Sequence, residues 1–493
     1  MTLILPLLEG ILISAIVSLI AWTQEYTLWI HWGDAATAVG RGGILSLCCM
    51  VVFYYADLYD LRIVPNFSRY FSRLPKSLFF VLFPLIVFYT LSPMAEITPN
   101  PFISGFLTLL VITGFLLPLR AIFYAILGNK RFIKRALILG ASPFAYQLIR
   151  EIEAHPRSRY STIGIVDDIV PSDNLPSRYP FLGSFKDLIK IIDETRPDRI
   201  IVALARSEDL PLRDLLQTRL HGVVVEDGVK VYERLTGKLA IDSLTPNSLI
   251  FSQDFNKRRL EIGLRRTFSL VLALPGLLLI FPLMVIIALA IKLDSEGPVF
   301  FVQERVGLRG RIFRLLKFRT MYPAQQQTSE WVRDNGHRIT QIGKRLRKFR
   351  LDELPQLFNI LRGDMDLVGP RPHPVSNYPL FVMVLRNASD YSGEAIPYYS
   401  LRCVIRPGVT GWAQVRYGYA NDLEEEIEKM RYDLYYIKHM SLGLDLRIFL
   451  DTIKVALLGQ GSEAANTAQH LPGSQDAVKS GRRSWESKST VEK

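Results

Sequence analysis

Four apolar runs, separated by shorter polar segments, occupy the first part of the chain at residues 3–22, 44–55, 78–91 and 102–127. An α-helix needs about 20 mainly apolar residues to cross the hydrocarbon core of a bilayer. The first and last runs have this length, and the middle two reach it only with their less polar flanks. The pattern therefore predicts four transmembrane helices over residues 1–128. Glu9, inside the first run, is expected to reach the interface or to face a neighbouring helix.

The basic residues between these runs predict their orientation. Lys and Arg gather in the loop before the third run and again from the later part of the fourth run onward, at Arg62, Arg69, Arg73, Lys76, Arg120, Lys130, Arg131, Lys134 and Arg135. The loop 92–101 contains neither. By the positive-inside rule, the N-terminus and everything after residue 130 should be cytoplasmic. A cleaved signal peptide is not expected, because no basic segment precedes the first run and no small-residue cleavage site follows it.

Residues 129–250 change to a pattern of short buried strands and helices. ALILG at 136–140 is typical of a buried strand, and TIGIVDD and RIIVALA indicate further parallel strands. Gly140 stands where a dinucleotide-binding loop would begin, but GASPFA lacks the three-glycine pattern. We interpret this region as a degenerate Rossmann-like α/β domain with a regulatory or structural role. A working cofactor site is the alternative.

A fifth apolar segment, residues 267–291, contains no charged residue. Lys and Arg flank it on both sides, which favours two cytoplasmic ends. Pro275 and Pro282 lie inside it, and proline bends a helix. We therefore predict a re-entrant membrane helix over about 267–292 that dips into one leaflet and returns. An ordinary proline-kinked span is the alternative, but it would separate the rest of the chain from nucleotide-activated substrates in the cytoplasm.

Composition agrees with a membrane protein. Hydrophobic residues make up 49% of the chain, and its formal net charge is +12. This combination favours a basic cytoplasmic side that meets anionic lipid or phosphorylated substrates, and so much apolar sequence argues against a nucleic-acid binder. The three cysteines show neither a disulfide framework nor zinc-ligand spacing. A polar segment at 461–493 is expected to be a disordered tail.

An acidic pair, Asp352 and Glu353, lies in a strongly basic stretch. Between residues 297 and 372 there are fifteen Lys or Arg and seven Asp or Glu. Arginine and lysine in such numbers suit phosphate groups. An acidic pair among them could hold Mg²⁺, which uses one or two carboxylates, or could supply a nucleophile. The alternative is an ordinary helix start, with Asp352 as the N-cap and Pro355 in the first turn.

Three motifs carry a resemblance to a known family. QERVGLRGRIFRLLKFRTM, LDELPQLFNILRGDMDLVGPRP and RPGVTGWAQV occur in order within about 250–460. Together they resemble the bacterial sugar transferases, the monotopic phosphoglycosyl transferases that act on polyprenyl phosphate. The four apolar runs, the Rossmann-like region and VYERLTGKL at 231–239 resemble the long, exopolysaccharide-associated members. The resemblance implies a monotopic α/β catalytic domain over 251–460, carried by a re-entrant helix bent at Pro282.

The resemblance also implies roles for individual residues. Asp352 would attack the β-phosphate of a UDP-sugar and release UMP, and undecaprenyl phosphate would then attack the phosphosugar–enzyme. Glu353 would be the Mg²⁺ ligand. The other implied substrate-binding residues are Lys317, Arg319, Arg347, Arg371 and Gln414. Gln414 would contact uridine, although its motif is also typical of a tight turn.

The expected partners are UDP-glucose or UDP-galactose, undecaprenyl phosphate and membrane lipid, with the catalytic domain on the cytoplasmic face of a bacterial plasma membrane. A homo-oligomer is compatible with the sequence. Two other functions are the alternatives. A membrane-anchored nucleotide-sugar dehydratase or epimerase would need a second, glycine-rich Rossmann domain and a Tyr-x-x-x-Lys pair. A non-catalytic scaffold of a polysaccharide assembly complex would not need the acidic pair.

Overall fold

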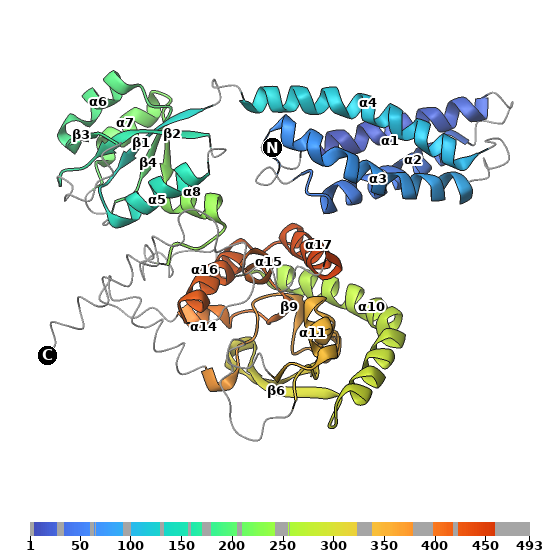
Figure 1. The fold of residues 1–493 in the computed structure, drawn as a ribbon. Coiled ribbons are helices and arrows are strands. Elements are labelled where there is room, and N and C mark those ends of the chain that lie inside the picture. Colours follow the sequence, from blue (N-terminus) through green and yellow to red (C-terminus); the bar gives the residue numbers. More distant parts are fainter. Residues whose placement is uncertain are drawn as a thin grey trace. The chain divides into compact units, whose positions relative to one another are not determined.

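In the computed structural model, helices alone form the first part of the chain, and helices with strands form the rest (Figure 1). The chain separates into two compact units, residues 1–133 and 134–493. The predicted tail at 461–493 and the predicted domain boundary at 250/251 lie outside the described residues. The structure describes residues 4–26, 34–59, 64, 66–91, 100–128, 133–155, 159–169, 179–204, 210–241, 255, 257–322, 338–377, 398–417 and 423–458.

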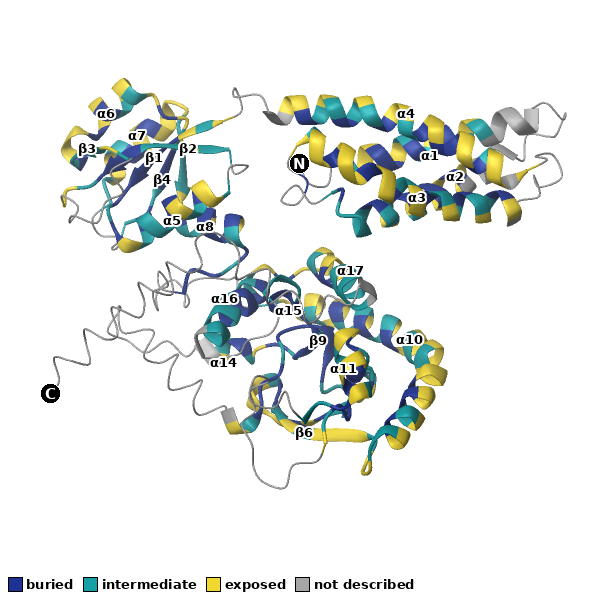
Figure 2. Ribbon diagram, viewed as in Figure 1, coloured by how far each residue is buried: buried dark blue, intermediate teal, exposed yellow. Residues whose placement is uncertain are grey.

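The first unit is a helical bundle made of α1 (Ile4–Tyr26), α2 (Asp34–Tyr55), α3 (Phe67–Leu91) and α4 (Pro101–Gly128). Much of its outer surface is exposed apolar side chains, with Phe79 and Phe83 72% and 71% exposed (Figure 2). Of the described residues of this unit, those in α3 and α4 form helices long and apolar enough to cross a membrane. The apolar stretches of α1 and α2 are shorter. The helical character is confirmed, and four full crossings stay a prediction.

A buried ion pair lies inside this bundle. Glu9 of α1 and Arg120 of α4 are both fully buried, and Nη2 of Arg120 donates to Oε2 of Glu9 at 3.0 Å. Arg120 also donates to the carbonyl of Leu58 at 2.9 Å, and its guanidinium lies 4.7 Å from the ring centroid of Tyr70. Glu9 therefore faces a neighbouring helix, where a charge must be paired to be tolerated.

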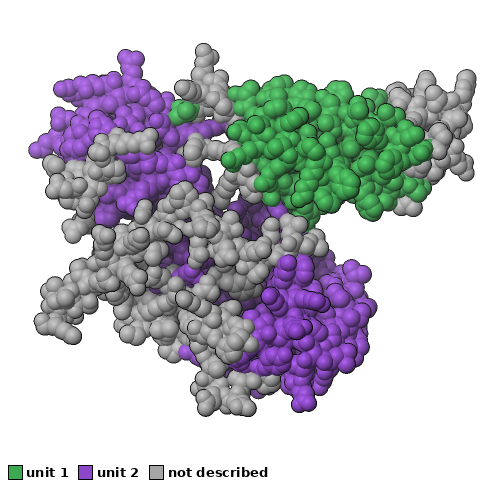
Figure 3. All heavy atoms as spheres, viewed as in Figure 1, with its two compact units in different colours: residues 1–133 green, residues 134–493 purple. Residues whose placement is uncertain are grey.

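The second unit (Figure 3) begins with a five-stranded parallel sheet in the order β3-β2-β1-β4-β5. This is the strand order of one doubly wound Rossmann-like sheet, so the predicted fold is confirmed. Within the described residues, an α-helix follows every strand of this sheet except β2. The elements are β1 (Lys134–Leu139), α5 (Pro143–Ala154), β2 (Tyr160–Val166), β3 (Phe181–Gly183), α6 (Leu188–Thr195), β4 (Arg199–Val202), α7 (Leu212–Leu220), β5 (Val224–Asp227) and α8 (Gly228–Thr236).

Strand β1 shows how the sequence pattern produces two cores. Ala136 and Ile138 point to the face covered by α5 and α8, whereas Leu137 and Leu139 point to the face covered by α6 and α7 (Figure 1). Successive side chains of a strand point to opposite faces. A strand covered on both sides is therefore apolar throughout, which explains the run that predicted it.

The polar groups of the loop after β1 make their hydrogen bonds within the protein. Gly140 has φ of +111°, and a Cβ there would lie 2.7 Å from the carbonyl oxygen of Ala203. The amide of Ala141 donates to Asp167, and Ser142 caps α5 by accepting from the amide of Ala145. These contacts use groups that a dinucleotide-binding loop would direct at phosphate. The preference for a regulatory or structural role stays a prediction.

The remaining part of the second unit carries the three motifs. A β-hairpin joins β6 (Phe300–Val306) to β7 (Ile312–Phe318), and β8 (Asp366–Val368) pairs in parallel with β9 (Gly408–Thr410). An apolar core that includes Leu434 and Ile448 holds these pieces together. The helices are α10 (Arg259–Asp294), α11 (Gln341–Lys348), α12 (Gln356–Arg362), α14 (Tyr398–Arg402), α15 (Trp412–Arg416), α16 (Leu423–His439) and α17 (Leu442–Leu458).

Helix α10 contains the fifth apolar segment. It is one helix of 36 residues that runs through both Pro275 and Pro282, and its ribbon curves (Figure 1). Near its start, Arg265 donates to Asp445 of α17 at 2.6 Å. Near its end, the side chains of Met284, Ile287 and Ile291 pack against Phe318 of β7 and Leu346 of α11. Both ends of the helix therefore contact the same part of the second unit.

Candidate active site

The acidic pair lies in a short 3-10 turn, Leu351–Glu353, between α11 and α12. The cap positions of this turn and of α12 belong to Arg350 and Pro355. The hypothesis that Asp352 is an N-cap is therefore wrong. Leu351 and Leu354 flank the pair and pack against the apolar cluster that includes the end of α10. This packing buries both carboxylates, which are 8% and 5% exposed.

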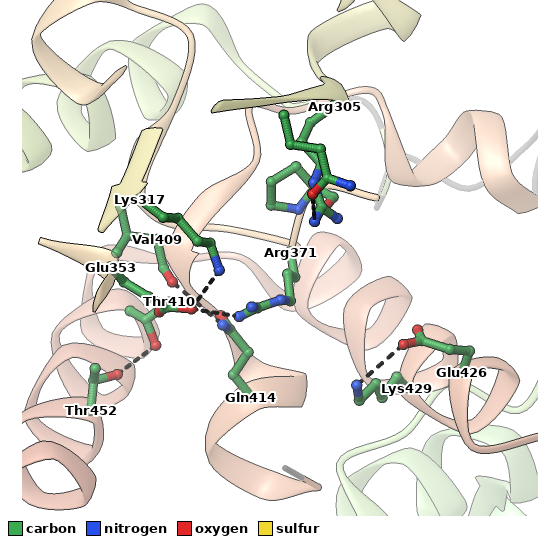
Figure 4. Close-up of polar contacts among 12 residues, drawn as sticks. Arg305, Lys317, Glu353, Arg371, Val409, Thr410, Gln414, Glu426, Lys429 and Thr452 are labelled. Carbon is green, nitrogen blue, oxygen red and sulfur yellow. Dashed lines mark hydrogen bonds and ion pairs between the residues drawn. The ribbon is translucent and has the colours of Figure 1, made fainter. Parts of the chain in front are cut away.

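Glu353 is held by two cations. Nη1 of Arg371 donates to its Oε1 at 3.0 Å, and Nζ of Lys317 donates to the same oxygen at 3.3 Å (Figure 4). Burial alone would raise the pKa of Glu353, but Arg371 and Lys317 outweigh it and lower that pKa to about 2. Glu353 is therefore an ionised carboxylate across the physiological range of pH.

Asp352 differs from its neighbour although both are buried. Burial raises the pKa of Asp352, Lys317 opposes that rise, and the charge of Glu353 adds to it. Burial and Arg371 together lower the pKa of Lys317 to about 8. Two adjacent carboxyls with different environments can divide between them the roles of charge holder and reacting group.

A small pocket opens beside this pair. Its cations come from two places: Arg305 and Lys317 from the hairpin, and Arg371 from the segment after β8 (Figure 4). Glu353 contacts two of these three cations directly. Such a concentration of positive charge fits a ligand with several phosphate oxygens. The lining residues are Arg305, Leu315, Lys317, Gln356, Arg371, Pro372, Gly408 and Val409.

Arg305 was not among the residues predicted from sequence, although a signal for it exists. In the antiparallel register Arg305 lies opposite Phe313, and Phe301 lies opposite Lys317. Side chains two residues apart along a strand share a face, so Leu315 and Lys317 lie on the same face of the hairpin as Arg305. Reading the hairpin with a period of two residues would therefore have paired Arg305 with Lys317.

Two of the predicted substrate-binding residues, Arg319 and Arg347, make their contacts outside the pocket. Arg319 donates to the carbonyls of Glu296 and Ser295 at 2.8 and 2.7 Å, and it thereby fixes the segment that leaves α10. Arg347 donates to Thr320 at 2.9 Å and contributes charge near Asp352. Neither side chain lines the pocket. The structure brings together Lys317 and Arg371 with the acidic pair, and it does not bring Arg319 there.

Gln414 lies on α15, directly behind the pocket wall. Its Nε2 donates to the carbonyl of Val409 at 3.4 Å, and its side chain is 6% exposed (Figure 4). Among the described residues, its Oε1 has no hydrogen-bond partner. This oxygen is an unused acceptor, but it is buried, so a ligand reaches it only if the chain around it shifts. Pro407, Gly408 and Gly411, which predicted a tight turn, instead lead into β9 and α15.

The main chain of Arg371 is held by buried contacts that the sequence did not reveal. Arg402 donates to the carbonyl of Arg371 and also pairs with Asp433 of α16 at 2.8 Å. Arg402 and Asp433 are 6% and 3% exposed, so this support is buried. It fixes the main chain from which the Arg371 side chain reaches Glu353.

No described group of three or more His, Cys, Asp or Glu side chains is arranged to hold a metal ion. Magnesium does not require such a group, because water and substrate phosphate fill the positions that one or two carboxylates leave. Asp352 and Glu353 offer this smaller donor set, and Oε2 of Glu353 makes no hydrogen bond within the described part of the chain. The residues present therefore fit Mg²⁺ bound together with a phosphate ligand.

Two family models match this chain. The model described as "Bacterial sugar transferase" matches residues 260–459, which include the acidic pair, the pocket and α10. The model described as "CoA-binding domain" matches residues 54–225. The first match covers the region in which the sequence motifs carried the resemblance.

Curated relatives agree with the first match. An N-acetylgalactosaminephosphotransferase that acts on UDP-N-acetylgalactosamine and undecaprenyl phosphate, from Aeromonas hydrophila, is 40% identical over 53% of this chain and 60% of its own length. The undecaprenyl-phosphate glucose phosphotransferase of Komagataeibacter xylinus is 32% identical over 66% of this chain and 59% of its own. A UDP-glucose:undecaprenyl-phosphate glucose-1-phosphate transferase of Klebsiella pneumoniae is 30% identical over 74% and 77%. The chain thus spans about 60% of the first two relatives.

Proposed function

Because the chain belongs to the bacterial sugar transferase family, we propose that it transfers a sugar-1-phosphate from a UDP-sugar to undecaprenyl phosphate. The observation that carries this proposal is the contrast between Asp352 and Glu353 beside the cationic pocket. Glu353 is ion-paired with Arg371 and Lys317, whereas Asp352 is buried next to them with a raised pKa. One carboxylate can therefore hold charge while the other reacts.

The reaction follows in two displacements. An oxygen of Asp352 attacks the β-phosphorus of the UDP-sugar, and the bond from that phosphorus to the bridging oxygen breaks as UMP leaves. A phosphate oxygen of undecaprenyl phosphate then attacks the same phosphorus. The bond to Asp352 breaks, and undecaprenyl-diphosphate-sugar forms. Each displacement exchanges one phosphorus–oxygen bond for another, so neither an oxidant nor a reductant is needed.

The neighbouring residues bind and orient the phosphates. Lys317, Arg371 and Arg305 line the pocket and would contact the diphosphate oxygens. Glu353, with its ionised carboxylate, would hold Mg²⁺ together with substrate phosphate. When bound, Mg²⁺ would neutralise charge that develops on the phosphate oxygens. Arg319 would act on the end of α10 rather than on the substrate. Oε1 of Gln414 is an unused acceptor that would accept from the uracil N–H once a local shift exposes it.

The membrane arrangement is part of the proposal. Helix α10 is long and apolar enough to cross a bilayer, yet Arg265 near its start and Ile291 near its end contact the same part of the second unit. A re-entrant helix in a bacterial plasma membrane accounts for both observations. It keeps the catalytic region on the cytoplasmic face, where UDP-sugars occur and where the phosphate of the lipid acceptor lies at the interface.

Neither rival function is supported by an observation. A dehydratase or epimerase needs a second Rossmann domain, and the described residues form one five-stranded parallel sheet. A scaffold does not need a buried acidic pair with three cations beside it, because an unused buried charge is destabilising. Both would fail to release UMP, so the decisive experiment is the same for each.

That experiment incubates the purified full-length protein and Mg²⁺ with UDP-glucose, UDP-galactose or UDP-N-acetylgalactosamine, without any lipid. The last sugar is included because one relative is named for it. We expect release of at most about one UMP per active site and a mass increase of one phosphosugar on Asp352. Addition of undecaprenyl phosphate should restart release and yield lipid-linked sugar. UMP release that strictly requires the lipid, with no adduct, contradicts the two-step reaction.

A further inference from the structure

The turn that follows α8, residues 237–241, belongs to the core of the transferase region. Helix α8 ends at Thr236, and Gly237 continues with φ of +70° while its amide donates to the main-chain carbonyl of Glu233 at 2.8 Å. Leu239 and Ile241 are 0% and 2% exposed, and they lie in the same apolar cluster as Trp412 and Leu434. The amide of Leu239 also donates to the carbonyl of Arg431 at 2.9 Å. We call this segment the α8 turn.

The α8 turn holds one aromatic side chain directly. Nε1 of Trp412 donates to the carbonyl of Gly237 at 2.9 Å, and the indole is 5% exposed. On its other side the ring stacks with Tyr435 at a centroid distance of 6.1 Å, and the guanidinium of Arg416 lies 4.4 Å from the ring centroid. A Cβ on Gly237 would lie 3.1 Å from Cζ2 of Trp412, so a side chain at this position would force the indole to shift.

Trp412 is also the first residue of α15, and Gly411 alone separates it from β9. Gly408 and Val409 of β9 line the small pocket beside the acidic pair, and Gln414 of α15 donates to the carbonyl of Val409. A displacement of Trp412 would therefore move a wall of the pocket and the candidate uracil acceptor together. It would leave the acidic pair, which lies between α11 and α12, in place.

Ion pairs add a second attachment between α8 and α16. Glu233 of α8 is 2% exposed and accepts from Lys438 at 3.0 Å and from His439 at 3.2 Å. Lys238 of the α8 turn pairs with Glu428. Buried pairs contribute little net stability but require a defined geometry. They therefore fix where the α8 turn lies against α16, and with it the position of the Gly237 carbonyl.

We propose that the α8 turn is a positioning element of the donor site, through which the Rossmann-like domain sets the pocket wall formed by β9 and α15. The turn touches neither substrate nor metal; it acts through the hydrogen bond from Trp412 to Gly237. This inference rests on the proposed function. It gives the Rossmann-like domain a task that requires no bound cofactor, in agreement with a loop after β1 whose amides are already used.

The test uses three variants of the full-length protein. Gly237→Ala places a methyl group against Trp412, and Trp412→Phe removes the N–H donor but keeps an aromatic ring. Gly222→Ala is the matched control, because Gly222 has φ of +94° with nothing within 4 Å of its Cβ position. The control thus introduces similar backbone strain in the same domain without touching the transferase core.

We expect Gly237→Ala and Trp412→Phe to raise KM for the UDP-sugar by roughly tenfold, with kcat and the lipid-free UMP burst within about twofold of wild type. Gly222→Ala should leave KM unchanged. Hydrogen–deuterium exchange of the peptide covering residues 408–416 should accelerate in the first two variants and not in the control.

Unchanged KM and exchange in both test variants overturn the proposal. A smaller burst with unchanged KM also overturns it, since that result indicates a lower fraction of folded enzyme rather than a shifted pocket. If the wild type releases no UMP with any UDP-sugar, the proposed function fails. The exchange measurement then still decides whether the α8 turn holds β9 and α15.

Discussion

Nη1 of Arg371 lies 3.0 Å from Oε1 of Glu353, and within the described residues no comparable ion pair reaches the adjacent Asp352. The two carboxyls lie in the same turn and are both buried, so their difference comes from which of them the cations contact. Arg371 and Lys317 commit Glu353 to its ionised form. Asp352 keeps its oxygens for another partner, which is the condition that a nucleophile needs.

The first prediction concerns Asp352. An amide cannot attack phosphorus, so Asp352→Asn should lower turnover by at least about a thousandfold while the protein stays folded. The phosphosugar adduct should disappear at the same time. Asp364→Asn is the matched control, because Asp364 lies just after α12, is only partly buried and pairs with Arg362 at 3.6 Å. Turnover and intact-mass measurements decide the matter, and full activity in Asp352→Asn would refute the whole site assignment.

The second prediction concerns pH. Burial and Arg371 lower the pKa of Lys317 to about 8, so this side chain loses its charge as the pH rises through 8. A neutral Lys317 attracts phosphate less, and kcat/KM for the UDP-sugar should therefore fall above about pH 8. Lys317→Arg keeps the charge at every accessible pH. The variant should lose this alkaline decline even if its absolute kcat/KM is lower. An identical decline in both proteins would assign it to another group.

Some features of the fold and the site could be predicted from the sequence, and others could not. The apolar runs and the parallel strands follow from local pattern, and the structure confirms the helices and the parallel sheet. The acidic pair follows from a motif, and its catalytic role stays a prediction. A motif does not show that Arg319 turns toward the segment after α10, and its role in substrate binding stays a prediction. The supporting role of Arg402 and the contacts of the α8 turn were missed, because these contacts join residues far apart in the chain. Such contacts depend on tertiary packing, which the local periodicity of a sequence does not predict.

The third prediction concerns the helical bundle. Arg120→Met leaves Glu9 buried without its partner and should destabilise the first unit by about 3–5 kcal/mol. The double variant Glu9→Leu/Arg120→Met removes both charges and should recover much of that loss. Arg73→Met is the control, since Arg73 is exposed and lies 3.8 Å from Asp57. Thermal unfolding in detergent provides the comparison, and equal midpoints for the single and double variants would contradict the pairing argument.

The fourth prediction concerns topology. A reporter fused at the C-terminus should be cytoplasmic, as should one inserted near Gln253, because both ends of α10 contact the same region. Pro282→Leu removes the proline that favours a bend and should lower activity in membranes. Leu279→Val is the control, because Leu279 lies on the same helix and is 83% exposed. Extracellular labelling of the C-terminal reporter would contradict re-entry.

The last prediction concerns how much of the chain the transferase region needs. A chain that begins at Gln253 keeps the acidic pair and the pocket, and on motif grounds alone it should retain turnover. It lacks Leu239 and Ile241, however, which are buried in the transferase core. Loss of these side chains should destabilise the region by roughly 3 kcal/mol or more and raise KM for the UDP-sugar. A chain that begins at Lys134 retains them and should match the full-length protein in KM. Equal unfolding midpoints and equal KM for the two truncated chains would show that the core closes without the α8 turn.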